Sequence, residues 1–101
     1  MAQNIYLIED MAWTILESKA AQKQIAKLPS RIKEQYEYWK SVALNGPEAL
    51  RASPGFNDEA LKGQWSGYRS SRLNLQYRVI YTVIRNELTI YVVRVSAHDY
   101  D

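Results

Sequence analysis

The stretch "QYRVIYTVIRNELTIYVVRVSA", residues 76–97, decides the fold that this sequence predicts. β-Branched and aromatic residues fill two runs, and the polar tripeptide at 85–87 between them indicates a tight hairpin. The preceding segment "GYRSSRLN", residues 67–74, has the same strand-like composition, and the residues at 74–76 predict a second turn. The pattern therefore predicts three consecutive antiparallel strands.

Upstream of these strands, the sequence predicts one further strand and two helices. "AWTILES", residues 12–18, is strand-like, whereas "KAAQKQIAKL", residues 19–28, has the apolar spacing of a short amphipathic helix. Pro29 ends that helix, and Ser30 is the predicted N-cap of a second one. The second helix carries an apolar stripe formed by Ile32, Tyr36, Trp39 and Ala43.

The order β-α-α-β-β-β predicts an α+β fold, with a small, mainly antiparallel sheet and both helices packed on one face. The other face is then open. We expect residues 46–67, rich in Gly, Pro, Ser, Asn and Asp, to form a long connection of the kind that is often functional. Residues 11–101 form the predicted single domain, and residues 1–10 are an N-terminal appendage or an edge strand.

Composition excludes several classes of function. Without cysteine, disulfides and thiolate chemistry are impossible, and with a single histidine a transition-metal site is not expected, so no cofactor is predicted. No apolar run has the length of a membrane span, and no export signal is evident, so we expect a cytoplasmic protein.

The charges are unevenly distributed although the net charge is only +2. From Gly63 onward the chain has five arginines and no lysine. Arginine binds phosphate oxygens in a bidentate manner, so this half is equipped to hold phosphate. The alternative is that these arginines border a small sheet and keep it soluble.

A candidate site combines Glu59 and Lys62 from the connection, Arg72 and Arg78 from successive strands, and the terminal segment His98-Asp99-Tyr100. Hairpin pairing should bring Arg72 near Arg78 and lay the end of the last strand beside them. An acid, guanidinium groups and an imidazole suit phosphodiester cleavage. Each also has a simpler interpretation: Glu59 as a solvated carboxylate, Arg78 as an ion-pair partner of Asp58 or of a C-terminal acid, and His98 as a surface residue.

The segments "EALKGQWSGYRSSRLNLQYRVIYTV" and "VVRVSAHDY" resemble the RelE/ParE superfamily of type II toxins, and most closely its RelE, YoeB and HigB ribonuclease branches. The resemblance implies a metal-independent mRNA endonuclease acting in the ribosomal A site, and a cognate antitoxin as partner. In that family the substrate's 2′-hydroxyl is the nucleophile.

The resemblance also implies roles for individual residues. Glu59 matches the general base, Arg78 the arginine that stabilises the phosphorane, and His98 the general acid. Four further residues are implied in substrate binding: Arg72, Tyr100, Lys62 and Arg69. Because Asp99 separates His98 from Tyr100, the sequence departs from relatives in which the two are adjacent. A ParE-like gyrase poison without nuclease activity is the alternative.

Overall fold

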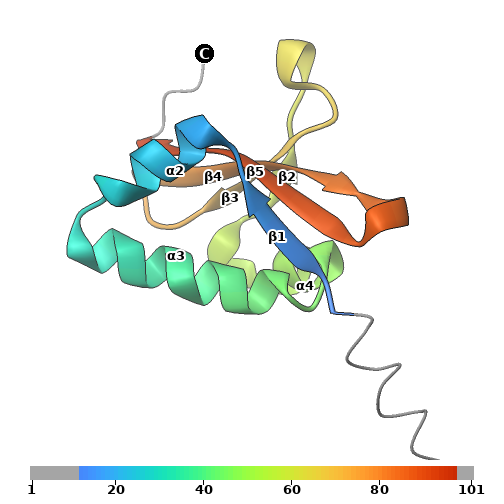
Figure 1. The fold of residues 1–101 in the computed structure, drawn as a ribbon, viewed down its shortest axis with the longest axis horizontal. Coiled ribbons are helices and arrows are strands. Elements are labelled where there is room, and N and C mark those ends of the chain that lie inside the picture. Colours follow the sequence, from blue (N-terminus) through green and yellow to red (C-terminus); the bar gives the residue numbers. More distant parts are fainter. Residues whose placement is uncertain (1–11, 98–101) are drawn as a thin grey trace, which may run out of the picture.

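The computed structural model describes residues 12–97, so the predicted role of residues 1–10 lies outside the described part of the chain. Five strands form one sheet in the order β1-β5-β4-β3-β2 (Figure 1). The strands are β1 (Thr14–Glu17), β2 (Glu59–Ala60), β3 (Arg69–Arg72), β4 (Tyr77–Ile84) and β5 (Thr89–Ala97). The predicted α+β class is confirmed.

Both predicted hairpins are present. β3 pairs antiparallel with β4, and β4 pairs antiparallel with β5. In the first turn the Asn74 side chain accepts hydrogen bonds from the backbone N–H groups of Gln76 and Tyr77, which explains why an asparagine marks this position. β1 instead pairs parallel with β5, because the two helices that follow β1 carry the chain across before the hairpins begin.

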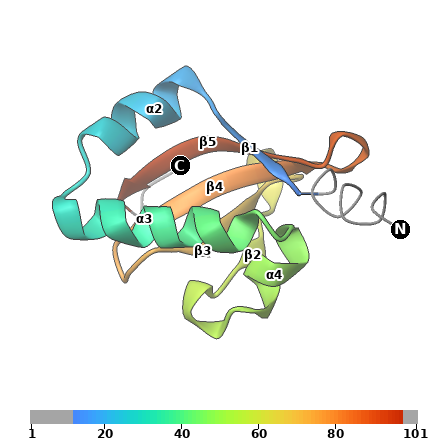
Figure 2. The ribbon, with the colours of Figure 1, turned by 60° about the horizontal axis from the view of Figure 1, so that its bottom comes forward.

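Three helices pack against this sheet: α2 (Lys19–Ala26), α3 (Ser30–Ala43) and α4 (Pro47–Ala52). Figure 2 shows α3 lying across one face of the sheet and α2 running beside the end of β5. The predicted long connection at 46–67 is partly wrong, since it contains α4 and the short strand β2. Its Gly and Pro residues begin and separate short elements instead of forming one loop. None of the helices between residues 12 and 97 is long and apolar enough to span a membrane.

A ladder of aromatic rings joins α3 to the sheet. Tyr36 stacks on Trp39 at 5.8 Å between centroids, and Trp39 meets the ring of Tyr81 on β4 edge to face at 5.5 Å. All three residues are fully buried. The Tyr36 hydroxyl donates to Glu17 at 2.6 Å, and burial together with this bond raises the pKa of the phenol far above its ordinary value. The predicted apolar stripe of the second helix is therefore core.

The helix caps differ from the prediction. Ser18 caps α2, since its hydroxyl accepts from the backbone N–H of Ala21 at 3.0 Å and donates to the carbonyl of Val93 at 3.1 Å. The prediction that Ser30 caps the next helix is wrong. Pro29, in an extended conformation, occupies the N-cap position, and its carbonyl accepts the first helical bond from Lys33.

Replacing Ser18 with alanine should therefore lower the free energy of unfolding by about 1–2 kcal/mol, because a cap and a tie to β5 are lost together. The matched control is Ser30→Ala, which removes no capping bond and should change stability by less than about 0.5 kcal/mol. Urea unfolding followed by circular dichroism measures both. Equal losses in the two variants would contradict the assignment of the caps.

Candidate functional site

Strand register divides the side chains of the sheet between two faces. Residues directly opposite each other on paired strands project to the same face, and neighbours along a strand alternate. Val79 and Tyr81 pack into the core under α3. Arg78 and Ile80 therefore project to the other face, which we call the open face.

One row of the open face begins at the predicted general base. Glu59 on β2 pairs with Ser70 on β3, Ser70 pairs with Ile80 on β4, and Ile80 pairs with Arg94 on β5. Glu59 is exposed, whereas Ser70 is fully buried. The Ser70 hydroxyl has no hydrogen-bond partner among residues 12–97. The carboxylate of Glu59 thus lies at the accessible edge of a row that ends in a guanidinium.

The next row holds the two predicted phosphate-binding arginines. Arg72 on β3 is directly paired with Arg78 on β4, and Arg78 is paired with Ser96 on β5. Like charges directly opposite each other are destabilising in a sheet. Neither arginine forms an ion pair with any residue of the described range 12–97. The Arg72 Nε is buried and has no partner there either. An anion bound between the two guanidinium groups would relieve both conditions.

Sheet geometry sets how far apart these groups begin. Adjacent strands are about 4.8 Å apart and alternate residues about 6.8 Å apart along a strand. The Cα atoms of Glu59 and Arg78, two strands and one row apart, are then separated by about 12 Å. Both side chains project from the same face and are long enough to meet over it. The strand register therefore places one carboxylate residue and two arginines in adjacent rows of one face.

A buried carboxylate on the opposite face fixes the strand that carries Glu59. The side chain of Asp58 is fully buried and accepts three hydrogen bonds of 2.6 Å each, from Arg69 Nε, Ser71 Oγ and the Tyr81 hydroxyl. Burial, together with the bond to Asp58, raises the pKa of the Tyr81 phenol well above its ordinary value, which keeps it a donor. Because β2 is only two residues long, these bonds hold it in register.

The remaining predicted residues have varied positions. Arg69 lies on the helix-covered face in its ion pair with Asp58, so it does not join Arg72 and Arg78. Lys62 is exposed at the start of the turn that follows β2. His98 and Tyr100 lie outside the described residues. The pairing of Ala97 with Tyr77 and of Ser96 with Arg78 confirms that the last strand ends beside the middle one.

The sequence predicts for Asp58 only a possible ion pair with Arg78, and it assigns Arg94 no role in the site. Arg94 instead belongs to the open face, in the row of Glu59. The two-residue alternation of Arg72 with Ser70, and of Arg94 with Ser96, was the available signal. This alternation shows which residues share a face only when the register between neighbouring strands is known.

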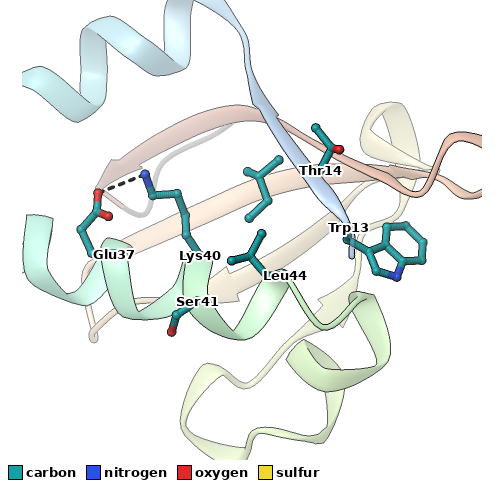
Figure 3. A pocket seen from close by; sticks show the side chains of 7 residues that line it. Trp13, Thr14, Glu37, Lys40, Ser41 and Leu44 are labelled. Atoms are coloured by element: carbon teal, nitrogen blue, oxygen red, sulfur yellow. Dashed lines mark ion pairs between the residues drawn. The ribbon is translucent and has the colours of Figure 1, made fainter. Parts of the chain in front are cut away.

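A concave region lies between β1 and the end of α3, with a volume of about 430 Å³ (Figure 3). Trp13, Ile15 and Leu44 supply apolar walls, and Leu44 is 48% exposed. An ion pair of 3.0 Å between Lys40 and Glu37 borders it. β1 is an edge strand of the described sheet, so this groove adjoins backbone groups that no strand within residues 12–97 pairs with.

The sheet order, the paired hairpins and the covering helix define a small α+β toxin fold of the RelE/ParE type. A family model described as the ParE toxin of the type II toxin–antitoxin system parDE matches residues 15–101. The chain belongs to this toxin family.

Solved structures agree with this assignment. YafQ from E. coli superimposes with a TM-score of 0.71 at 18% identity, over 85% of this chain and 93% of that chain. The archaeal RelE–RelB complex from Pyrococcus horikoshii gives 0.70 at 19% identity, over 89% and 99% of the two chains. The YoeB/ParE toxin from Agrobacterium tumefaciens gives 0.67 at 18% identity, over 85% and 99%. At these identities the likeness shows the fold alone. No curated protein sequence matches the chain significantly.

Replacing Asp58 with asparagine should lower the free energy of unfolding by about 2–4 kcal/mol, because a buried carboxylate that accepts three bonds loses its charge and one acceptor. The adjacent Glu59→Gln is the matched control: it removes an exposed carboxylate and should cost less than about 0.5 kcal/mol. Urea denaturation midpoints measure both. A stable Asp58→Asn protein would show that the cluster does not hold β2.

Proposed function

We propose that this protein is the toxin of a type II toxin–antitoxin system and acts as a metal-independent endoribonuclease on mRNA in the ribosomal A site. The observation that carries the proposal is the direct pairing of Arg72 with Arg78 on the open face, with Glu59 in the next row. Two guanidinium groups that form no ion pair within residues 12–97, beside an exposed carboxylate, suit a phosphodiester substrate. The site of action would be the cytoplasm, where ribosomes are found.

The proposed chemistry is an internal transfer. Glu59 removes the proton from the ribose 2′-hydroxyl, and that oxygen attacks the adjacent phosphorus. Arg78 stabilises the charge that develops on the phosphorus oxygens, and Arg72 holds the phosphate. His98 protonates the departing 5′-oxygen, which leaves a 2′,3′-cyclic phosphate and a 5′-hydroxyl. Tyr100 shapes the pocket and Lys62 contacts the RNA backbone, whereas we assign Arg69 to holding Asp58.

Arg78→Ala should reduce mRNA cleavage by about 10²–10³-fold, since a group that stabilises transition-state charge is removed. Primer extension on a translated transcript, with and without the protein, measures the cleavage. Arg85→Ala is the matched control, because Arg85 is an exposed arginine at the far end of β4 whose partner is Glu48. The control should cleave like the wild type. Full activity in Arg78→Ala would remove the arginine pair from the mechanism.

The alternative is a ParE-like poison of DNA gyrase without nuclease activity. The observation in its favour is that the matching family model is that of the ParE toxin. Fold does not separate the two functions. Incubating the protein with ribosomes that carry an mRNA separates them. Cleavage of that mRNA in the A site would support the nuclease. DNA double-strand breaks in the presence of gyrase, with intact mRNA, would support the poison.

We further propose that the apolar groove between β1 and α3 receives a segment of the cognate antitoxin. The YafQ and RelE structures include complexes with DinJ and RelB respectively, so proteins of this fold are held by antitoxins. The groove offers apolar walls beside a strand edge, which suits an extended segment with apolar side chains. It is lined from β1 and α3, away from the open face.

Leu44→Lys should weaken antitoxin binding by about 10–100-fold, because burial of a leucine side chain is lost on association. Leu75→Lys is the control: Leu75 is 83% exposed in the turn between β3 and β4, distant from the groove. Calorimetric titration with the antitoxin measures affinity, and mRNA cleavage by Leu44→Lys alone should stay unchanged. Equal affinities for both variants would locate the antitoxin elsewhere.

A further inference from the structure

A large aromatic side chain is held on an exposed turn next to the open face. Trp65 lies in the short helical turn η2 (Gly63–Trp65), and its neighbours from Lys62 to Gly67 are exposed. Gly63 and Gly67 flank it with left-handed φ angles of 66° and 95°, which other residues rarely adopt. Figure 1 shows this turn rising on the side of the sheet away from α3. Trp65 is half-buried there, unlike the core residue Trp39.

Several contacts fix this turn in place. The Thr82 hydroxyl donates to the carbonyl of Gly67 at 2.9 Å, and the backbone N–H of Leu61 donates to the carbonyl of Tyr68 at 2.9 Å. The Tyr68 ring meets Trp65 edge to face at 5.4 Å. The indole is therefore contacted by a neighbouring ring, and the backbone on either side of it is hydrogen-bonded to the rest of the domain.

Arg94 connects the indole to the predicted phosphate site. Its guanidinium carbon lies 5.5 Å from the centroid of the Trp65 ring. Arg94 is in the row of Glu59, directly beside the row of Arg72 and Arg78. A nucleotide whose phosphate contacts Arg78 would therefore reach this region with its base. A planar cation next to aromatic rings is a surface on which bases stack without regard to sequence.

We infer that Trp65, Tyr68 and Arg94 form a stacking subsite for the nucleobase next to the cleaved phosphate of an unpaired RNA strand. The inference rests on the proposed ribonuclease function and deepens it. Stacking on an aromatic side chain raises affinity by about 5–100-fold per base and tolerates every base. The subsite would hold the strand while Glu59 and Arg78 act on the phosphate.

The test uses a fluorescently labelled six-nucleotide RNA, methylated on its 2′-oxygens so that it binds without being cut. A second copy lacks one base beside the central phosphate, so that stacking at that position is lost. Fluorescence anisotropy gives both affinities. The wild type should prefer the complete RNA by about 5–100-fold. Trp65→Ala should bind the two RNAs equally, and Trp65→Phe should retain most of the preference.

Tyr38→Ala is the control for aromatic loss, since Tyr38 is 59% exposed on α3 and should keep the wild-type preference. Arg78→Ala should weaken both RNAs to the same extent. If Trp65→Ala keeps the preference while Arg78→Ala weakens both RNAs, the stacking subsite is wrong and the phosphate site stands. If Arg78→Ala binds both RNAs like the wild type, the phosphate site is wrong and the subsite with it. If the wild type binds neither RNA, the stacking subsite is wrong, and primer extension on a translated transcript decides the proposed function separately.

Discussion

The carboxylate of Asp58 is the group on which the arrangement of this protein depends. It is fully buried, and it is compatible with the core only because Arg69, Ser71 and Tyr81 each donate to it. These donors come from β3 and β4, so one side chain ties the start of the two-residue strand β2 to its neighbour β3 and to the next strand, β4. The next residue is Glu59, whose position on the open face follows from that attachment.

The sheet separates stability from function by its two faces. On one face, Tyr81 continues an aromatic ladder through Trp39 to Tyr36, and these rings fill the space under α3. On the other, Arg72 and Arg78 lie side by side although their charges repel. A protein selected only for stability has no reason to keep such a pair. This pairing is the observation on which the proposed phosphate site depends.

Membership of the toxin family does not by itself determine the activity, which depends on the residues of the site. Solved structures named YafQ, RelE and YoeB/ParE share this fold at identities near 18–19%, while the matching family model is named for ParE. Toxins with different names thus share one fold, so the activity of this protein has to be inferred from its side chains. The nuclease proposal depends on the groups around Arg78. The groove lined by Trp13 and Leu44 lies elsewhere, so binding of an antitoxin and catalysis would use separate surfaces.

The sequence by itself determined the elements with strong local signals. Period-two and period-3.6 patterns predicted the hairpins and the first two helices, and turn residues such as Asn74 marked the joints. The family motif singled out Glu59, Arg72 and Arg78 from their spacing along the chain. Only the tertiary structure decided that Arg69 faces the core with Asp58, that Arg94 faces outward, and that β1 runs parallel to β5. The reason is physical: facing and pairing are set by contacts between segments far apart along the chain, and no local pattern encodes them.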